Sequence, residues 1–144
     1  MEFFAYAGVR MSASDIQRYI NISNLVEWCA SIDKVLSVQD ERGDIYCVWG
    51  EFRVHRELIS EGVRFTLPNC KNGIQWTLTP NPANFAEVMI HCTINRPEQD
   101  PDFVESLEIF VNDWRAGIEE WPVRRAAKRK KPCLNCGDNF GGFG

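Results

Sequence analysis

The spacing of apolar residues changes along this chain from a helical period to strict alternation and back to a helical period. These changes divide it into helices and strands. Residues 2–10 are rich in aromatic side chains and predict a first strand. The hydroxyl of Ser12 or of Ser14 can then accept hydrogen bonds from the free amides of a first helical turn. Residues 23–29 predict a second short helical piece. The start of the chain therefore predicts one strand followed by two short helices.

Between residues 32 and 94 the apolar positions alternate with polar ones, which is typical of half-buried strands. Turn signals interrupt this pattern, among them Asn72-Gly73 and the run at 80–82, which contains two prolines. The segments between the turns predict about six strands of an antiparallel meander, and they span residues 32–39, 45–49, 52–58, 63–67, 74–79 and 85–94.

The last element is the most clearly marked helix of the sequence. Asp100 can cap its first turn, Pro101 suits the first helical position, and Pro122 is expected to end it. One apolar face recurs at steps of three and four residues, formed by Phe103, Leu107, Phe110, Trp114, Ile118 and Trp121. About twenty helical residues span roughly 30 Å. Such a helix can lie across a whole small sheet.

This order of elements resembles the START-like superfamily, also called SRPBCC, which includes polyketide-cyclase-like proteins. The resemblance covers residues 3–121. Its most suggestive pieces are residues 12–16 with 25–28, which resemble the helix pair after the first strand, and residues 74–78 with 114–118, which resemble the late strand and final helix. The resemblance implies an α+β helix-grip fold, in which a curved antiparallel sheet of about six to seven strands wraps around the long C-terminal helix.

Charge divides the chain into two parts. Residues 1–121 carry 10 Lys and Arg against 19 Asp and Glu, whereas residues 122–144 carry 6 against 1. We expect a START-like domain over 1–121 and a basic, Gly-rich tail over 122–144. The acidic domain disfavours general nucleic-acid binding by its own surface. The tail is interpreted either as a solvated extension or as a segment that attracts nucleic acid, an acidic protein or anionic lipid.

Two of the six cysteines lie in the tail. Cys133 and Cys136 have the Cys-x-x-Cys spacing of half a zinc site, and a tetrahedral site needs two more ligands. These would come from a second subunit, from a partner, or from Cys70, Cys92 or His91. Zinc and a homodimer are therefore hypotheses for the tail. The other cysteines lie singly, which is typical of free thiols that pack as small apolar groups.

No apolar run approaches the roughly 20 residues that span a bilayer. The N-terminus carries Glu2 where a secretory signal would carry Lys or Arg, and no cleavage site follows an apolar run. The expected location is the cytoplasm.

The resemblance implies a cavity between sheet and final helix that binds a hydrophobic or amphipathic small molecule. The residues expected to line it are Trp49, Phe52, Phe65, Trp76, Phe85, Phe110 and Trp114, together with Arg56. Two alternatives stay open at this point. The aromatic side chains would equally well fill a solid core, and Arg56 would either anchor an acidic ligand or reach solvent at a strand end.

The sequence contains no Gly-x-Ser-x-Gly, no phosphate-binding glycine loop and no His-Glu-x-x-His. Three functions follow as hypotheses. The first is binding of an apolar or amphipathic ligand in the cavity. The second is a protein-interaction adaptor that uses the outer sheet surface and the tail. The third is a cyclase- or hydrolase-like enzyme that uses the same cavity.

Overall fold

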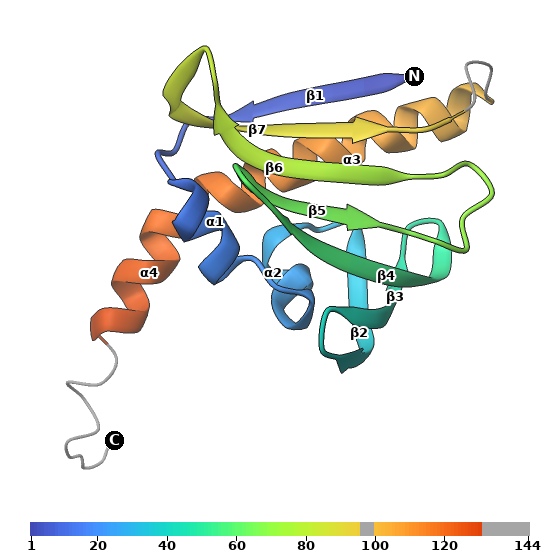
Figure 1. Cartoon of the computed structure of the whole chain (residues 1–144), viewed down its shortest axis with the longest axis horizontal. Coiled ribbons are helices and arrows are strands. Elements are labelled where there is room, and N and C mark those ends of the chain that lie inside the picture. The colour runs from blue at the N-terminus through green and yellow to red at the C-terminus, as the bar shows by residue number, and fades with distance from the viewer. Residues whose placement is uncertain (96–99, 131–144) are drawn as a thin grey trace.

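The computed structural model of the chain describes residues 1–95 and 100–130, the last four by their backbone alone. A curved sheet wraps around one long helix, and shorter helices lie at one end (Figure 1). Along the chain the elements are β1 (Glu2–Ala7), α1 (Ala13–Tyr19), the 3₁₀ turn η1 (Ile22–Asn24), α2 (Leu25–Trp28), β2 (Ile32–Gln39), β3 (Arg42–Cys47), β4 (Gly50–Ile59), β5 (Gly62–Thr66), β6 (Gln75–Asn81), β7 (Asn84–Thr93), α3 (Pro101–Glu119) and α4 (Trp121–Lys130).

The sheet has seven antiparallel strands in the order β1-β7-β6-β5-β4-β3-β2. Each of β2 to β7 pairs with its neighbour in sequence, as short turns require. The first strand instead pairs with the last one, so that Phe4 lies opposite His91. The predicted helix-grip class is confirmed.

One face of the sheet is buried against α3, which runs behind it in Figure 1. Along β7 the even-numbered residues Val88, Ile90 and Cys92 are buried, as the period of two requires. From the other side α3 contributes Leu107, Phe110, Val111, Trp114 and Ile118. At roughly 1.5–3 kcal/mol for each large side chain removed from water, this layer is the main source of stability.

The N-cap of helix α1 is Ser12, a choice that the sequence had left open against Ser14. The Ser12 Oγ accepts a hydrogen bond from the Asp15 amide at 3.0 Å, and the Asp15 carboxylate accepts one from the Ser12 amide at 3.1 Å. This reciprocal pair is a capping box.

Helix α3 begins at Pro101 behind the cap Asp100, as predicted, and ends at Glu119. The chain then continues as a further helix, α4, with Pro122 at its second position. The long helix does end shortly before Pro122, but the further helix was not expected; Pro122 is tolerated there because a proline in a first turn lacks only an amide that would have no intrahelical partner.

Candidate ligand-binding site

Four of the predicted lining residues form one aromatic cluster between the sheet and α3. Phe65 and Trp76 come from β5 and β6, while Phe110 and Trp114 come from α3. Each side chain is at most 1% exposed. Ring centroids of Phe65–Trp76 and Trp76–Phe110 lie 5.4 and 4.8 Å apart, and those of Phe65–Trp114 and Trp76–Trp114 lie 6.1 and 6.3 Å apart. These contacts fill the centre of the domain with aromatic rings.

The cluster is less enclosed toward the N-terminal half of α3. Trp49 and Phe103 are half-buried there, and their ring centroids lie 6.1 Å apart. Trp49 also contacts the buried Phe110 at 5.0 Å, and its indole N–H donates to the Ser106 Oγ at 2.8 Å. Phe52 is half-buried as well. This edge is where the aromatic cluster comes nearest to solvent among the described residues.

Two indole N–H groups of the cluster are buried without a hydrogen-bond acceptor among the described residues, those of Trp76 and Trp114. A third such donor belongs to Trp28 of α2. Buried donors in folded proteins are almost always paired, and an unpaired one costs about 1–3 kcal/mol. The face of a neighbouring aromatic ring is only a weak acceptor. The interior therefore contains three indole donors without a partner among the described residues.

Thiols are the other polar groups of the interior. Burial raises the pKa of Cys92 to about 12, and it also raises the pKa of Cys29 and of Cys47. Because a thiol must lose its proton to act as a nucleophile, these three side chains are poorly suited to covalent catalysis near neutral pH.

Arg56 faces the interior, as the alternation along β4 predicts, and its side chain is 5% exposed. Its guanidinium donates to the carbonyl oxygens of Ile20 and Gln17 at 2.9 and 2.5 Å, and it pairs with the Glu41 carboxylate at 3.0 Å. The alternative in which Arg56 reaches solvent at a strand end was wrong. Its donors hold the carbonyl end of α1, so they are not directed at the aromatic cluster.

Phe85 lies away from the predicted site. It is 63% exposed at the start of β7. Residues 84–86 are all exposed, because the pairing of β7 with β6 is irregular between Asn84 and Val88 and strict alternation begins only beyond it. Phe85 therefore does not line the interior.

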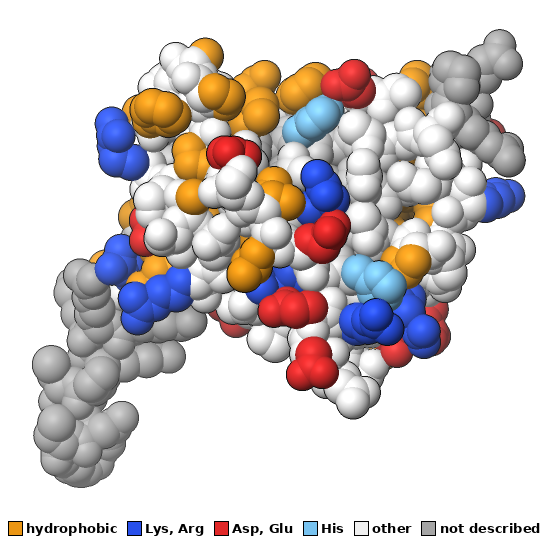
Figure 2. All heavy atoms as spheres, in the orientation of Figure 1, with side chains coloured by type: hydrophobic (Ala, Val, Ile, Leu, Met, Phe, Trp, Pro, Cys, Tyr) orange, Lys and Arg blue, Asp and Glu red, His pale blue; other side chains and the backbone are white. Residues whose placement is uncertain are grey.

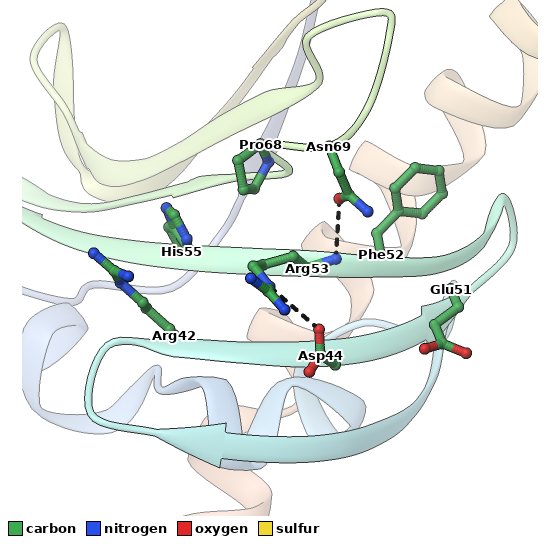
Figure 3. Close-up of a pocket in the computed structure, with 8 residues that line it drawn as sticks. All are labelled: Arg42, Asp44, Glu51, Phe52, Arg53, His55, Pro68 and Asn69. Atoms are coloured by element: carbon green, nitrogen blue, oxygen red, sulfur yellow. Dashed lines mark hydrogen bonds and ion pairs between the residues drawn. The ribbon is translucent and has the colours of Figure 1, made fainter.

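The outer face of the sheet carries a polar hollow over β3 and β4, lined by Arg42, Asp44, Glu51, Phe52, Arg53, His55, Pro68 and Asn69. Figure 3 shows Pro68 and Asn69 approaching it from the loop after β5. Arg53 pairs with Asp44 at 3.5 Å, and the Asn69 side chain accepts from the Arg53 amide. Figure 2 shows acidic and basic side chains mixed over this face. This open, partly self-paired surface is unlike a pocket for an apolar ligand.

The predicted zinc ligands Cys133 and Cys136 lie outside the described residues. Within residues 1–95 and 100–126, no group of three or more His, Cys, Asp or Glu side chains could hold a metal ion. The four described cysteines are free thiols. No helix in the part of the chain that the structure describes is long and apolar enough to cross a membrane.

This chain is similar to a known protein in its fold and not in its sequence. No family model matches the sequence. No curated protein matches it either. Among solved structures, a START superfamily protein from Mycobacterium smegmatis superposes with a TM-score of 0.54 over 84% of this chain and 97% of that one, at 12% sequence identity. The fold is START-like.

Within this START-like fold, five predicted lining residues share one place. Phe65, Trp76, Phe110 and Trp114 form the buried cluster and Trp49 contacts its edge. Sequence reasoning did not include Phe103 in the lining, although Phe103 belongs to the apolar face that predicted α3. It also did not anticipate the unpaired indole groups, because hydrogen-bond partners depend on tertiary contacts rather than on spacing.

Proposed function

We propose that this protein binds an amphipathic small molecule between the sheet and α3, with an oxygen atom of the molecule accepting hydrogen bonds from the indole N–H groups of Trp76 and Trp114. The observation that carries the proposal is that both donors are buried and unpaired among the described residues. The START-like fold supports it, since the resemblance implies hydrophobic or amphipathic ligands.

The polar part of the ligand follows from the chemistry of these donors. An indole N–H donates and cannot accept, so its partner has to be a carbonyl, carboxylate, ether or hydroxyl oxygen. A molecule without such an oxygen would leave both donors unpaired. The apolar part would lie among Phe65, Phe110 and their neighbours, where each buried methylene contributes about 0.8 kcal/mol.

Entry requires a rearrangement, because the rings of the cluster are in contact. Trp49 and Phe103 are the half-buried members at its edge. The hydrogen bond from Trp49 to Ser106 ties this edge to α3. In the proposed mechanism, this bond opens, both rings swing outward, and the ligand takes their place against Phe110.

The test compares two amphiphiles of equal chain length, oleate and oleylamine, by native mass spectrometry and by intrinsic tryptophan fluorescence. Oleate presents oxygen acceptors, whereas protonated oleylamine presents only donors. We expect oleate to bind at least 10-fold more tightly. Trp76→Phe combined with Trp114→Phe removes the donors but keeps an aromatic ring at each position, and it should cancel this preference.

Trp121→Phe in α4 serves as the matched control, because it makes the same chemical change away from the cluster. It should keep the preference for oleate. The proposal is wrong if wild-type protein binds neither amphiphile, if it binds both equally, or if the double Trp76 and Trp114 variant still prefers oleate. The first of these outcomes would favour an adaptor that works through its outer surface.

A further inference from the structure

The first turns of α4 form a second feature, separate from the interior. A crevice lies where α4 meets α1 and α2, and it is lined by Tyr19, Asn24, Glu27, Trp28, Trp121, Arg124 and Arg125. Figure 1 shows α4 projecting from the domain beside α1. Figure 2 shows Lys and Arg side chains gathered at the base of α4. The crevice is thus a basic and aromatic site on an otherwise acidic domain.

Aromatic rings hold the arginines of this crevice in place. The Arg124 guanidinium lies 4.6 Å from the centre of the Trp28 ring, and the Arg125 guanidinium lies 5.0 Å from that of Trp121. Arg125 and Arg18 also lie 5.7 and 5.3 Å from the Tyr19 ring. A guanidinium stacked on a ring keeps its N–H groups at its rim, where they can bind an anion in bidentate fashion.

The carboxylates near Arg124 and Arg125 neutralise only part of the positive charge of these two arginines. Arg124 donates to the Gly117 carbonyl oxygen at 2.9 Å and lies 3.8 Å from the Glu120 carboxylate. Arg125 makes no ion pair with a described carboxylate. Glu27 is the acid that lines the crevice. The sequence of α4 contains five Lys and Arg residues and no Asp or Glu. The helix as a whole is therefore suited to a ligand with several negative charges.

We propose that this crevice, built by Tyr19, Trp28, Trp121, Arg124 and Arg125, binds the phosphodiester backbone of single-stranded nucleic acid. Arginine forks match phosphate oxygens, and a positively charged groove that follows the backbone is typical of single-strand binding surfaces. A rigid duplex would bring many phosphates close to a domain with a net charge of −9 over residues 1–121. A flexible single strand can follow the short basic helix and avoid that domain.

A membrane surface fits the same helix less well. A helix that lies in a bilayer interface needs a broad apolar face opposite its basic one. Of the large apolar side chains on the described part of α4, Trp121 is buried against the domain and Val123 is 72% exposed. One exposed valine does not make a broad apolar face. The observations therefore favour nucleic acid over lipid.

The test is fluorescence anisotropy of a labelled 20-nucleotide single-stranded RNA of mixed sequence, titrated with the full chain between 50 and 200 mM NaCl. We expect Arg124→Gln combined with Arg125→Gln to weaken binding at least 10-fold. The slope of log affinity against log salt should become shallower by about 1.4, since each phosphate contact on a single strand contributes about 0.7.

Two further variants separate the crevice from general charge. Arg124→Lys combined with Arg125→Lys keeps the charge but loses the planar forks, so it should weaken binding at least 3-fold with an unchanged salt slope. Arg64→Gln removes one arginine of the outer sheet face, whose side chain is 38% exposed and paired with Glu57. It should bind within 2-fold of wild type. Thermal unfolding of each variant, and of Arg125→Gln alone, checks that α4 remains docked.

The proposal is overturned if the wild-type chain fails to bind the RNA at 50 mM NaCl, or if the double glutamine variant binds within 2-fold of it. It is also overturned if binding is confined to phosphatidylserine-containing vesicles, which would assign the arginines to a membrane surface. Binding of RNA that depends on both arginines and is tighter than binding to phosphatidylserine-containing vesicles supports it.

Discussion

Arg56 shows how a single charged residue is accommodated in an apolar interior. Its charge is balanced by one half-exposed carboxylate, that of Glu41, and by two main-chain carbonyl oxygens at the end of α1. Those carbonyls carry the partial negative charge of a helix C-terminus, which favours a cation beside them. Arg56 therefore joins β4 to α1 and fixes the position of that helix.

Removing this side chain should be costly. We predict that Arg56→Met lowers the free energy of unfolding by about 2–4 kcal/mol, because one buried and one part-buried carbonyl oxygen lose their donors. Arg53→Met, on the outer face of the same strand, should change it by less than about 0.5 kcal/mol, since that side chain is 59% exposed. Urea unfolding measures both. Equal losses would show that Arg56 has no special structural role.

The buried thiols give stability a defined dependence on alkaline pH. Cys92 has a pKa of about 12 in the folded protein against 9.0 ordinarily, so the unfolded chain loses its proton first as the pH rises. Stability should therefore be complete below pH 9 and decline between pH 9 and 12, by at most about 1.4 kcal/mol per pH unit for this group.

Cys92→Ala should make this decline shallower, whereas Val88→Ala, an apolar truncation on the same face of β7, should not. Both residues are fully buried, so both variants lose packing, and only the first loses a titrating group. Urea midpoints at pH 8 and pH 11 measure the difference. An identical pH dependence in the two variants would contradict the assignment.

At the scale of elements, the local signals of this sequence were sufficient for most of the fold. Alternation predicted β2 with its observed bounds, and the apolar face of 103–121 predicted α3. The same signals missed α4, because the basic run from 124 to 131 has no apolar period. The first turns of α4 are held by Arg124 on the Trp28 ring and by Arg125 on the Tyr19 ring, which are contacts between distant segments.

The start of α1 offers a test of one such local signal. We predict that Ser12→Ala costs about 1 kcal/mol of stability, because it removes the acceptor of the Asp15 amide. Ser14→Ala, inside the helix and exposed, should cost less than about 0.5 kcal/mol, since alanine favours a helix interior. Urea unfolding measures the loss of stability in both variants. A larger loss for Ser14→Ala than for Ser12→Ala would contradict the assignment of Ser12 as the N-cap.

At the scale of the whole molecule, the sequence predicted an architecture better than a site. Five of the eight residues proposed to line the interior lie in the aromatic cluster or in ring contact with it, and Phe52 is half-buried against the core. Phe85 was misplaced because it lies before the regular part of β7, where residues 84–86 are all exposed. For Arg56 the face was predictable but the partners were not, since Gln17, Ile20 and Glu41 meet it only once α1 packs on the sheet.

The molecule has two candidate sites at separate places. One is the interior between sheet and α3, with the donors of Trp76 and Trp114, and the other is the basic crevice at α4. Each proposal has its own variants, so the failure of one leaves the other standing. The interior site is the central claim, because it rests on the START-like fold as well as on the unpaired donors.

The most direct test of that claim is the ¹H–¹⁵N spectrum of the five tryptophan indole groups, recorded during titration with oleate. A new hydrogen bond moves an indole proton resonance downfield. We predict downfield shifts for Trp76 and Trp114, loss of the Trp49 hydrogen bond to Ser106, and an unchanged Trp121 resonance. Trp76 and Trp114 resonances that stay in place while oleate binds would contradict the claim.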